Sequence, residues 1–73
     1  MKRHYLVHTR GHSYAFTAEE GKELQLPPRL RKRVAAHLKI HDMLLDESVT
    51  IFQGSTGIVL QRVRPDWSHA YEN

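Results

Sequence analysis

The 73-residue sequence has no cysteine, only three prolines and four glycines, and no long apolar run. Without cysteine the chain can form neither a disulfide framework nor a thiolate zinc site, and such a composition fits a reducing compartment, so we expect a cytoplasmic protein. No segment approaches the roughly 20 apolar residues of a membrane-spanning helix, and the N-terminus lacks the apolar segment of a signal peptide. We therefore expect no membrane partner.

The chain is also too short for much interior. A single domain of this size buries only about 60% of its unfolded surface, so a substrate pocket is hard to build without a partner. Serines occur without the sequence context of a catalytic nucleophile, and Gly54-Ser55-Thr56-Gly57 lacks the lysine and helix of a phosphate loop. These absences predict a protein that is not an enzyme and needs no cofactor.

One stretch shows helical periodicity. Apolar residues recur at Leu30, Val34, Leu38 and Leu45, the three- and four-residue spacing of a helix with one buried stripe. Pro28 suits the first turn of a helix, where its missing N–H is not needed. The pattern predicts a helix that begins at Pro28 and ends near residues 46–48.

The charges along this predicted helix oppose its dipole. A basic run occupies its first turns, where the backbone already carries partial positive charge, and acidic residues occupy its expected C-terminal end. Either acidic residues in the connector 18–26 neutralise the basic turn, or the basic turn meets an anionic partner. The residues concerned are Arg29, Arg31, Lys32 and Arg33 at the start, and Asp42, Asp46 and Glu47 at the end.

Four segments alternate as strands and pair as two hairpins. Residues 2–8 and 13–17 flank a turn with Gly11, and residues 48–53 and 57–63 flank a turn with Gly54. We predict an α+β fold of the order ββαββ over residues 1–64, a small antiparallel sheet of two hairpins with the helix packed across it. In the last hairpin apolar residues point to both faces, so one face must be partly exposed or covered. The expected core comprises Leu6, Phe16, Leu30, Val34, Leu38, Ile51, Ile58 and Leu60, with Leu24 and Leu26 holding the connector against it.

Residues 65–73 are expected to form a mobile C-terminal tail, since Pro65 ends the last strand and no apolar periodicity follows. The tail contains the only tryptophan, Trp67, and also Tyr71. These aromatic residues either fold back onto a thin core or anchor a partner, a role in which both residue types are enriched.

The six histidines suggest metal binding only weakly. His37 and His41 lie four residues apart on the predicted helix, but no third ligand accompanies them. We expect both to be partly buried beside the apolar stripe with their hydrogen bonds satisfied, and we expect no metal site.

Two partner classes remain open on the residues alone. A protein partner would contact the basic turn and the aromatic tail, whereas nucleic acid would place phosphates on Arg29–Arg33, with Arg3, Arg62 and Arg64 extending the stripe. Bases would then stack on Tyr5, Tyr14 and Phe16 if these were exposed. The candidate partner-binding residues are Arg29, Arg31, Lys32, Arg33, Arg62, Arg64, Trp67 and Tyr71.

In its length, its lack of cysteine, its divided charge and its aromatic tail, the chain resembles a small phage-encoded inhibitor of bacterial RNA polymerase. Such inhibitors displace the σ factor and also act as antiterminators. The resemblance implies a protein of the host cytoplasm that binds the large polymerase subunits and inhibits transcription initiation. Separately from the resemblance, we expect a monomer rather than an oligomer. It assigns no functional residues, and a different host target fits the same residues.

Overall fold

The structure is a computed structural model that describes residues 2–19 and 24–66. It contains β1 (Arg3–Thr9), β2 (His12–Ala18), α1 (Pro28–Ile40), β3 (Ser48–Gln53) and β4 (Thr56–Val63). The predicted α+β class and the order of its elements are therefore confirmed. Of the expected tail, only residues 65 and 66 fall within the described residues; Trp67 and Tyr71 lie outside them.

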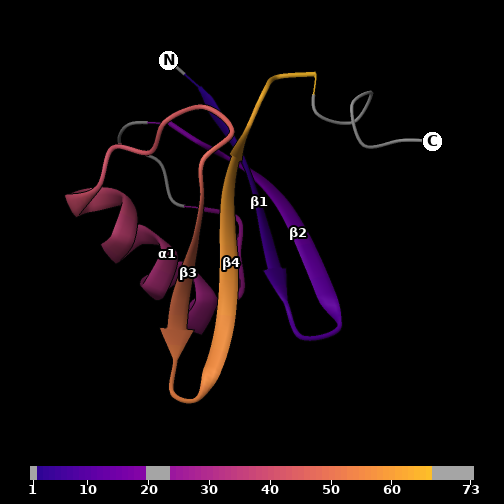
Figure 1. Ribbon diagram of the computed structural model, residues 1–73, viewed down its shortest axis with the longest axis vertical. Coiled ribbons are helices and arrows are strands. Elements are labelled where there is room, and N and C mark those ends of the chain that lie inside the picture. The colour runs from indigo at the N-terminus through magenta and orange to yellow at the C-terminus, as the bar shows by residue number, and fades with distance from the viewer. Residues whose placement is uncertain (1, 20–23, 67–73) are drawn as a thin grey trace.

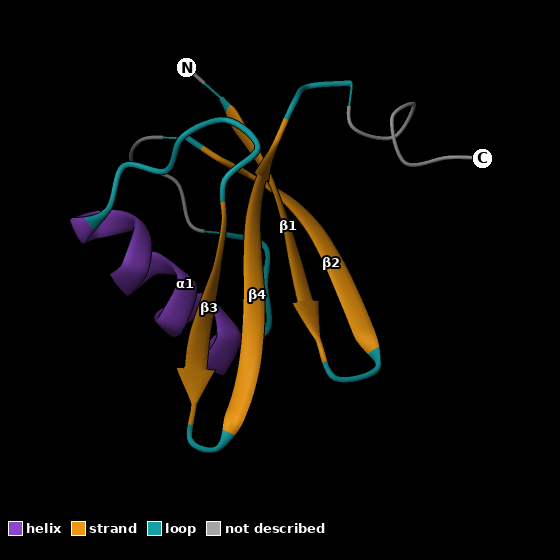
Figure 2. Cartoon of the chain, viewed as in Figure 1, coloured by secondary structure: helices purple, strands orange, loops and turns teal. Residues whose placement is uncertain are grey.

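The strands form one antiparallel sheet with the order β2-β1-β4-β3. The two terminal strands of the fold, β1 and β4, pair at its centre with His4 opposite Val63 and His8 opposite Val59. This central pairing joins the two hairpins, so β2 and β3 form the edges (Figure 1). The only helix of the described residues lies on one face of the sheet (Figure 2), and no described helix is long and apolar enough to cross a membrane.

Each hairpin closes through a two-residue turn. Thr9 pairs with His12 around Arg10 and Gly11, and Gly11 has a φ of 84°. The second turn has a glycine first, Gly54, with a φ of 64°, which is the requirement of a type II′ hairpin turn. Both positions favour glycine because other residues rarely adopt positive φ.

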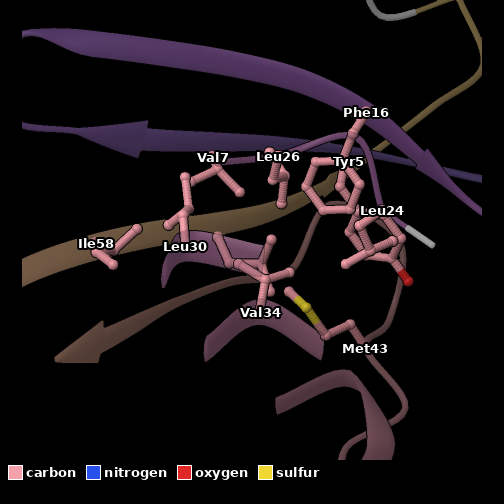
Figure 3. Close-up of a cluster of buried hydrophobic side chains, with 10 residues drawn as sticks. Tyr5, Val7, Phe16, Leu24, Leu26, Leu30, Val34, Met43 and Ile58 are labelled. Atoms are coloured by element: carbon pink, nitrogen blue, oxygen red, sulfur yellow. The ribbon is translucent and has the colours of Figure 1, made fainter. Parts of the chain in front are cut away.

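Alternation along the strands divides the sheet into two faces. Tyr5 and Val7 point toward α1, as do Phe16, Ile58 and Leu60 on the neighbouring strands. The Tyr5 and Phe16 rings are stacked with centroids 5.3 Å apart. Figure 3 shows these side chains meeting those of the helix and connector, and the complete cluster is Tyr5, Val7, Phe16, Leu24, Leu26, Leu30, Val34, Met43, Ile58 and Leu60.

Most of the expected core is confirmed. Phe16, Leu30, Val34, Ile58 and Leu60 are buried, and so are Leu24 and Leu26 of the connector. Two further expected residues, Leu38 and Ile51, are partly buried against the cluster.

The face of the sheet opposite α1, here called the outer face, is less well covered. Leu6 is buried there, although it lies outside the cluster under the helix. Phe52, on the same face, keeps 65% of its surface exposed, and Val59 keeps 37%. The prediction that one face of the last hairpin is partly exposed is therefore confirmed.

The predicted end of the helix was wrong. α1 ends at Ile40, and His41 already has an extended backbone. Met43 turns back into the cluster and is only 1% exposed, while the Arg62 guanidinium donates a 2.7 Å hydrogen bond to its carbonyl oxygen. A helix continued through residue 46 would remove these tertiary contacts and place Asp42 and Asp46 at the negative end of the helix dipole.

Residues 44–47 form a tight turn instead of a last helical turn. The Glu47 N–H donates to the Leu44 carbonyl at 3.0 Å, and the Leu44 N–H donates to the Glu47 carboxylate at 2.8 Å. Asp46 has a φ of 66°, the sign required at the third position of a type II turn. Aspartate tolerates this left-handed backbone better than most residues, which explains its place here.

Leu45→Pro tests this turn. Leu45 occupies the second turn position, where proline is common, and among the described residues its N–H donates no backbone hydrogen bond. We expect the free energy of unfolding to stay at the wild-type value or to rise by about 0.4–1 kcal/mol. A helix through residue 45 would instead lose about 3 kcal/mol. Urea unfolding measures the difference, and Ala36→Pro inside α1 is the control that should show the large loss.

Candidate functional site

Charge is divided between the two ends of the molecule. All five acidic residues within the described part lie at the end where β1 begins, α1 finishes and β4 finishes: Glu19, Asp42, Asp46, Glu47 and Asp66. The opposite end carries the hairpin turns and the start of α1. Four exposed basic side chains gather there, and we call them the basic pole: Arg10, Arg29, Lys32 and Arg33.

At the acidic end, two of the carboxylates are paired with arginines. The Arg3 guanidinium donates a hydrogen bond to the Asp42 carboxylate, which lowers the pKa of Asp42 and raises that of Arg3. Arg64 and Asp46 form a 3.3 Å ion pair. The arginines at this end therefore hold the loop after α1 in place.

The basic pole has no such compensation among the described residues. The first turn of α1 contains no acidic residue and no side chain caps its N-terminus. Arg29, Lys32 and Arg33 form no ion pair with a carboxylate among residues 2–19 and 24–66; the ion pairs there involve Arg3 and Arg64. The positive side chains of the basic pole and the positive end of the helix dipole therefore add to one field.

The two hairpins separate at the basic pole. Pairing between β1 and β4 ends at His8 and Val59, although β1 continues to Thr9 and β4 begins at Thr56. Figure 1 shows the two turns diverging below this point. We call the region between the turns the hairpin fork.

An open hollow lies on each side of the fork, and Thr9 and Thr56 line both. The hollow on the helix side has a volume of about 580 Å³ and is lined by Thr9, Tyr14, Pro27, Arg29, Leu30, Gly54 and Thr56. The hollow on the outer face has a volume of about 510 Å³ and is lined by His8, Thr9, Arg10, Ser55, Thr56, Gly57 and Val59. Each hollow therefore combines one arginine with several hydroxyl groups and some apolar surface.

Local hydrogen bonds fix the first hairpin at the fork. The Thr9 hydroxyl donates to the His12 carbonyl at 3.1 Å, and His8 Nδ1 lies 2.9 Å from the Ser13 hydroxyl oxygen. The rings of His12 and Tyr14 meet edge to face with centroids 5.7 Å apart. The turn that carries Arg10 is thus anchored on both sides.

An exposed aromatic residue lies beside the outer hollow. Phe52 pairs with Gly57, and a Cβ atom on Gly57 would lie 3.9 Å from the Phe52 ring. The glycine therefore lies next to the ring and lines the hollow at once. Because Gly57 has no side chain, nothing at that position stands between the hollow and the ring.

The structure divides the sequence-predicted site residues into three groups. Arg29, Lys32 and Arg33 are exposed at the basic pole, and Arg31 is half-buried on the same turns of α1. Arg62 and Arg64 lie at the acidic end, six or more residues along β4 from Thr56, which is about 20 Å at the usual strand rise. Trp67 and Tyr71 lie outside the described residues. The expected basic stripe therefore does not form one surface.

Sequence reasoning missed Arg10 and Phe52. Arg10 sits in the predicted turn beside Gly11, where an exposed arginine at a hairpin tip was a usable signal. Tyr5 and Phe16, which were considered for base stacking, are 2% and 6% exposed and belong to the core. Tyr14, the third residue considered for base stacking, is half-buried, and among residues 2–19 and 24–66 Phe52 is the Phe, Tyr or Trp residue that is classed as exposed.

Three exposed aliphatic residues lie close together in the sequence, around the end of α1. Ile40, Leu44 and Leu45 keep 77%, 71% and 47% of their surfaces exposed.

His37 lies in the last turn of α1, and His41 follows directly after the helix. The His37 and His41 rings stack with centroids 4.6 Å apart, and no group of three potential ligands occurs among the described residues. Contrary to the expectation of satisfied histidines, His37 Nε2 is buried and lacks a hydrogen-bond partner within the described structure. Burial lowers the pKa of His37, and the nearby His41 lowers it further, while Glu47 acts in the opposite direction.

This lowered pKa predicts a pH-dependent stability. The unfolded chain binds a proton at position 37 more readily than the folded chain, so the free energy of unfolding is fully retained above about pH 6.5 and falls as the pH drops below it. Urea unfolding at pH 7.5 and pH 5.5 measures the loss. His37→Gln should reduce the difference between the two pH values, and an unchanged difference would contradict the assignment to His37.

Comparison with protein-family models, with curated proteins and with solved structures finds no significant match to this chain.

Proposed function

We propose that this chain is a non-enzymatic regulatory protein that binds a larger machine through its basic pole and blocks the surface it covers. The division of charge carries the proposal. Three exposed cations on the first turns of α1 oppose the helix dipole, and no ion pair with a described carboxylate offsets them. An anionic partner surface would turn this unfavourable arrangement into a favourable one.

The resemblance in size and character to small phage inhibitors gives the partner to test first, bacterial RNA polymerase. In that reading the protein inhibits transcription initiation in the host cytoplasm. The exposed aliphatic side chains of Ile40, Leu44 and Leu45 favour a protein partner, because aliphatic side chains do not stack on bases but are common in the apolar core of protein interfaces.

Affinity capture tests the proposal. The immobilised protein is exposed to a nuclease-treated bacterial extract, and the retained proteins are identified. We expect RNA polymerase to be retained by the wild type, to be lost with Arg29→Glu, and to be retained with Lys2→Glu, which makes a comparable charge change at an exposed position before β1. The purified protein should then reduce initiation from a promoter in a reconstituted reaction.

The alternative function is nucleic-acid binding by the turn Arg29–Arg33. The exposed side chains of Arg29, Lys32 and Arg33 support it, because arginine and lysine side chains are the usual partners of phosphates. Retention of nucleic acid before nuclease treatment, with no polymerase retained afterwards, would reject the polymerase proposal and support this alternative. Equal loss of polymerase with Arg29→Glu and Lys2→Glu would reject a specific role for the basic pole.

A further inference from the structure

We propose that the outer hollow of the hairpin fork binds single-stranded nucleic acid, with a phosphate against Arg10 and a base against Phe52. This site differs from the helix turn Arg29–Arg33 and does not depend on polymerase binding. It is formed by the two hairpin turns and lies on the face of the sheet opposite α1.

The polar side of the hollow suits a phosphate group. Arg10 lines the hollow on one side of the fork, and Ser55 and Thr56, which both carry hydroxyl groups, line it on the other side. Arginine, serine, threonine and backbone N–H groups are the usual partners of phosphate oxygens. The ladder between β1 and β4 stops at His8 and Val59, so the facing backbone edges beyond this pair are not joined to each other.

Charge around the hollow favours an anion. No carboxylate lines it among the described residues, and the acidic residues of the described chain lie at the other end of the sheet. Arg29 lines the hollow on the opposite side of the fork, with Thr9 and Thr56 shared between the two. A nucleic-acid strand that leaves the outer hollow therefore continues along positive potential.

The apolar side of the hollow suits a base. Phe52 is 65% exposed, and Val59, which lines the hollow, is 37% exposed. Gly57 lines the hollow next to the ring and leaves it accessible. Aromatic side chains that stack with bases beside a cationic groove are the shared feature of proteins that bind single strands without sequence preference.

The same features exclude a duplex as the preferred ligand. Bases in a duplex are stacked on one another and do not present a free face to Phe52, whereas a single strand does. An acidic peptide would satisfy Arg10 but would make no use of the exposed ring. A single strand uses both sides of the hollow.

Fluorescence anisotropy with fluorescein-labelled 12-nucleotide oligo(U), and with a 12-base-pair DNA duplex for comparison, tests the proposal. We expect the wild type to bind oligo(U) more tightly than the duplex, with a dissociation constant that rises with salt. Phe52→Ala should weaken binding about tenfold or more, the usual effect of losing one stacked base. Arg10→Gln should weaken binding and reduce the slope of log affinity against log salt by about 0.7.

Two further variants make the test specific. Gly57→Glu introduces a carboxylate into the hollow; a Cβ at this position meets its neighbours no closer than 3.5 Å, so the fold should tolerate the change while binding is lost. Lys2→Gln removes one charge at the other end and should leave affinity nearly unchanged. Thermal unfolding confirms that each variant is folded.

Three results would overturn the proposal. They are duplex binding as tight as oligo(U) binding, full affinity in the Phe52→Ala variant, and equal losses in Arg10→Gln and Lys2→Gln. The anisotropy assay contains no polymerase, so a negative result in it does not count against the polymerase proposal. Failure to capture polymerase likewise does not count against the single-strand site.

Discussion

Met43→Ala is expected to lower the free energy of unfolding by about 2–5 kcal/mol. Met43 follows the end of α1 and is 1% exposed, and its side chain reaches toward Val34 in the core (Figure 3). Truncation removes apolar contacts and leaves a cavity between the loop and the helix. A domain of 73 residues has a total stability of only about 4–11 kcal/mol, so much of the protein would unfold at moderate temperature.

Leu44→Ala is the matched control, because the next residue is 71% exposed. We expect its free energy of unfolding to change by no more than about 0.5 kcal/mol. Chemical unfolding followed by circular dichroism measures both variants. In the observed loop Met43 is buried and Leu44 is exposed. A large loss of stability in Leu44→Ala with a small loss in Met43→Ala would therefore contradict the loop.

The pattern of the sequence predicts the elements of this fold because their periodicities are local. The alternation in both hairpins and the glycines at their turns decide the strands, and the prolines decide where α1 begins. The end of α1 depends on contacts between distant segments. Arg62 reaches Met43 across 19 residues, and Arg3 reaches Asp42 across 39. Helical spacing continues through Leu45 and gives no sign of these contacts.

One local signal did mark the end of the helix. Asp42, Asp46 and Glu47 would be unfavourable in the last turns of a helix, and ending α1 at Ile40 leaves His37 and Lys39 there instead. At the other end the conflict between charge and dipole persists in the structure. The rule that charges should complement the helix dipole thus marks the wrongly predicted boundary at one end of α1 and a candidate binding surface at the other.

The candidate site was only partly predictable for a similar reason. The basic turn Arg29–Arg33 is contiguous in sequence and visible as a run of charge. The hairpin fork combines residues 8–10 with residues 55–59, and only the pairing of β1 with β4 brings them together. Two hairpins in a chain do not by themselves reveal which strands join them, so Arg10 and Phe52 could not be connected from the sequence.

Phe16→Ala should lower the free energy of unfolding by about 3–5 kcal/mol. Phe16 is 6% exposed and stacks on Tyr5 beneath α1, so its loss removes both buried area and an aromatic contact. Its effect on nucleic-acid binding should follow unfolding alone. At temperatures where the variant remains folded, the affinity for oligo(U) should match that of the wild type.

Phe52→Ala should give the opposite result with the same chemical change. Phe52 is 65% exposed, so the free energy of unfolding should shift by no more than about 0.5 kcal/mol, while affinity for oligo(U) falls. Urea unfolding and anisotropy on the two variants separate an aromatic residue that supports the fold from one that contacts a ligand. If Phe52→Ala destabilised the protein as much as Phe16→Ala, the outer face would be covered in solution and the ring would not be free to stack on a base.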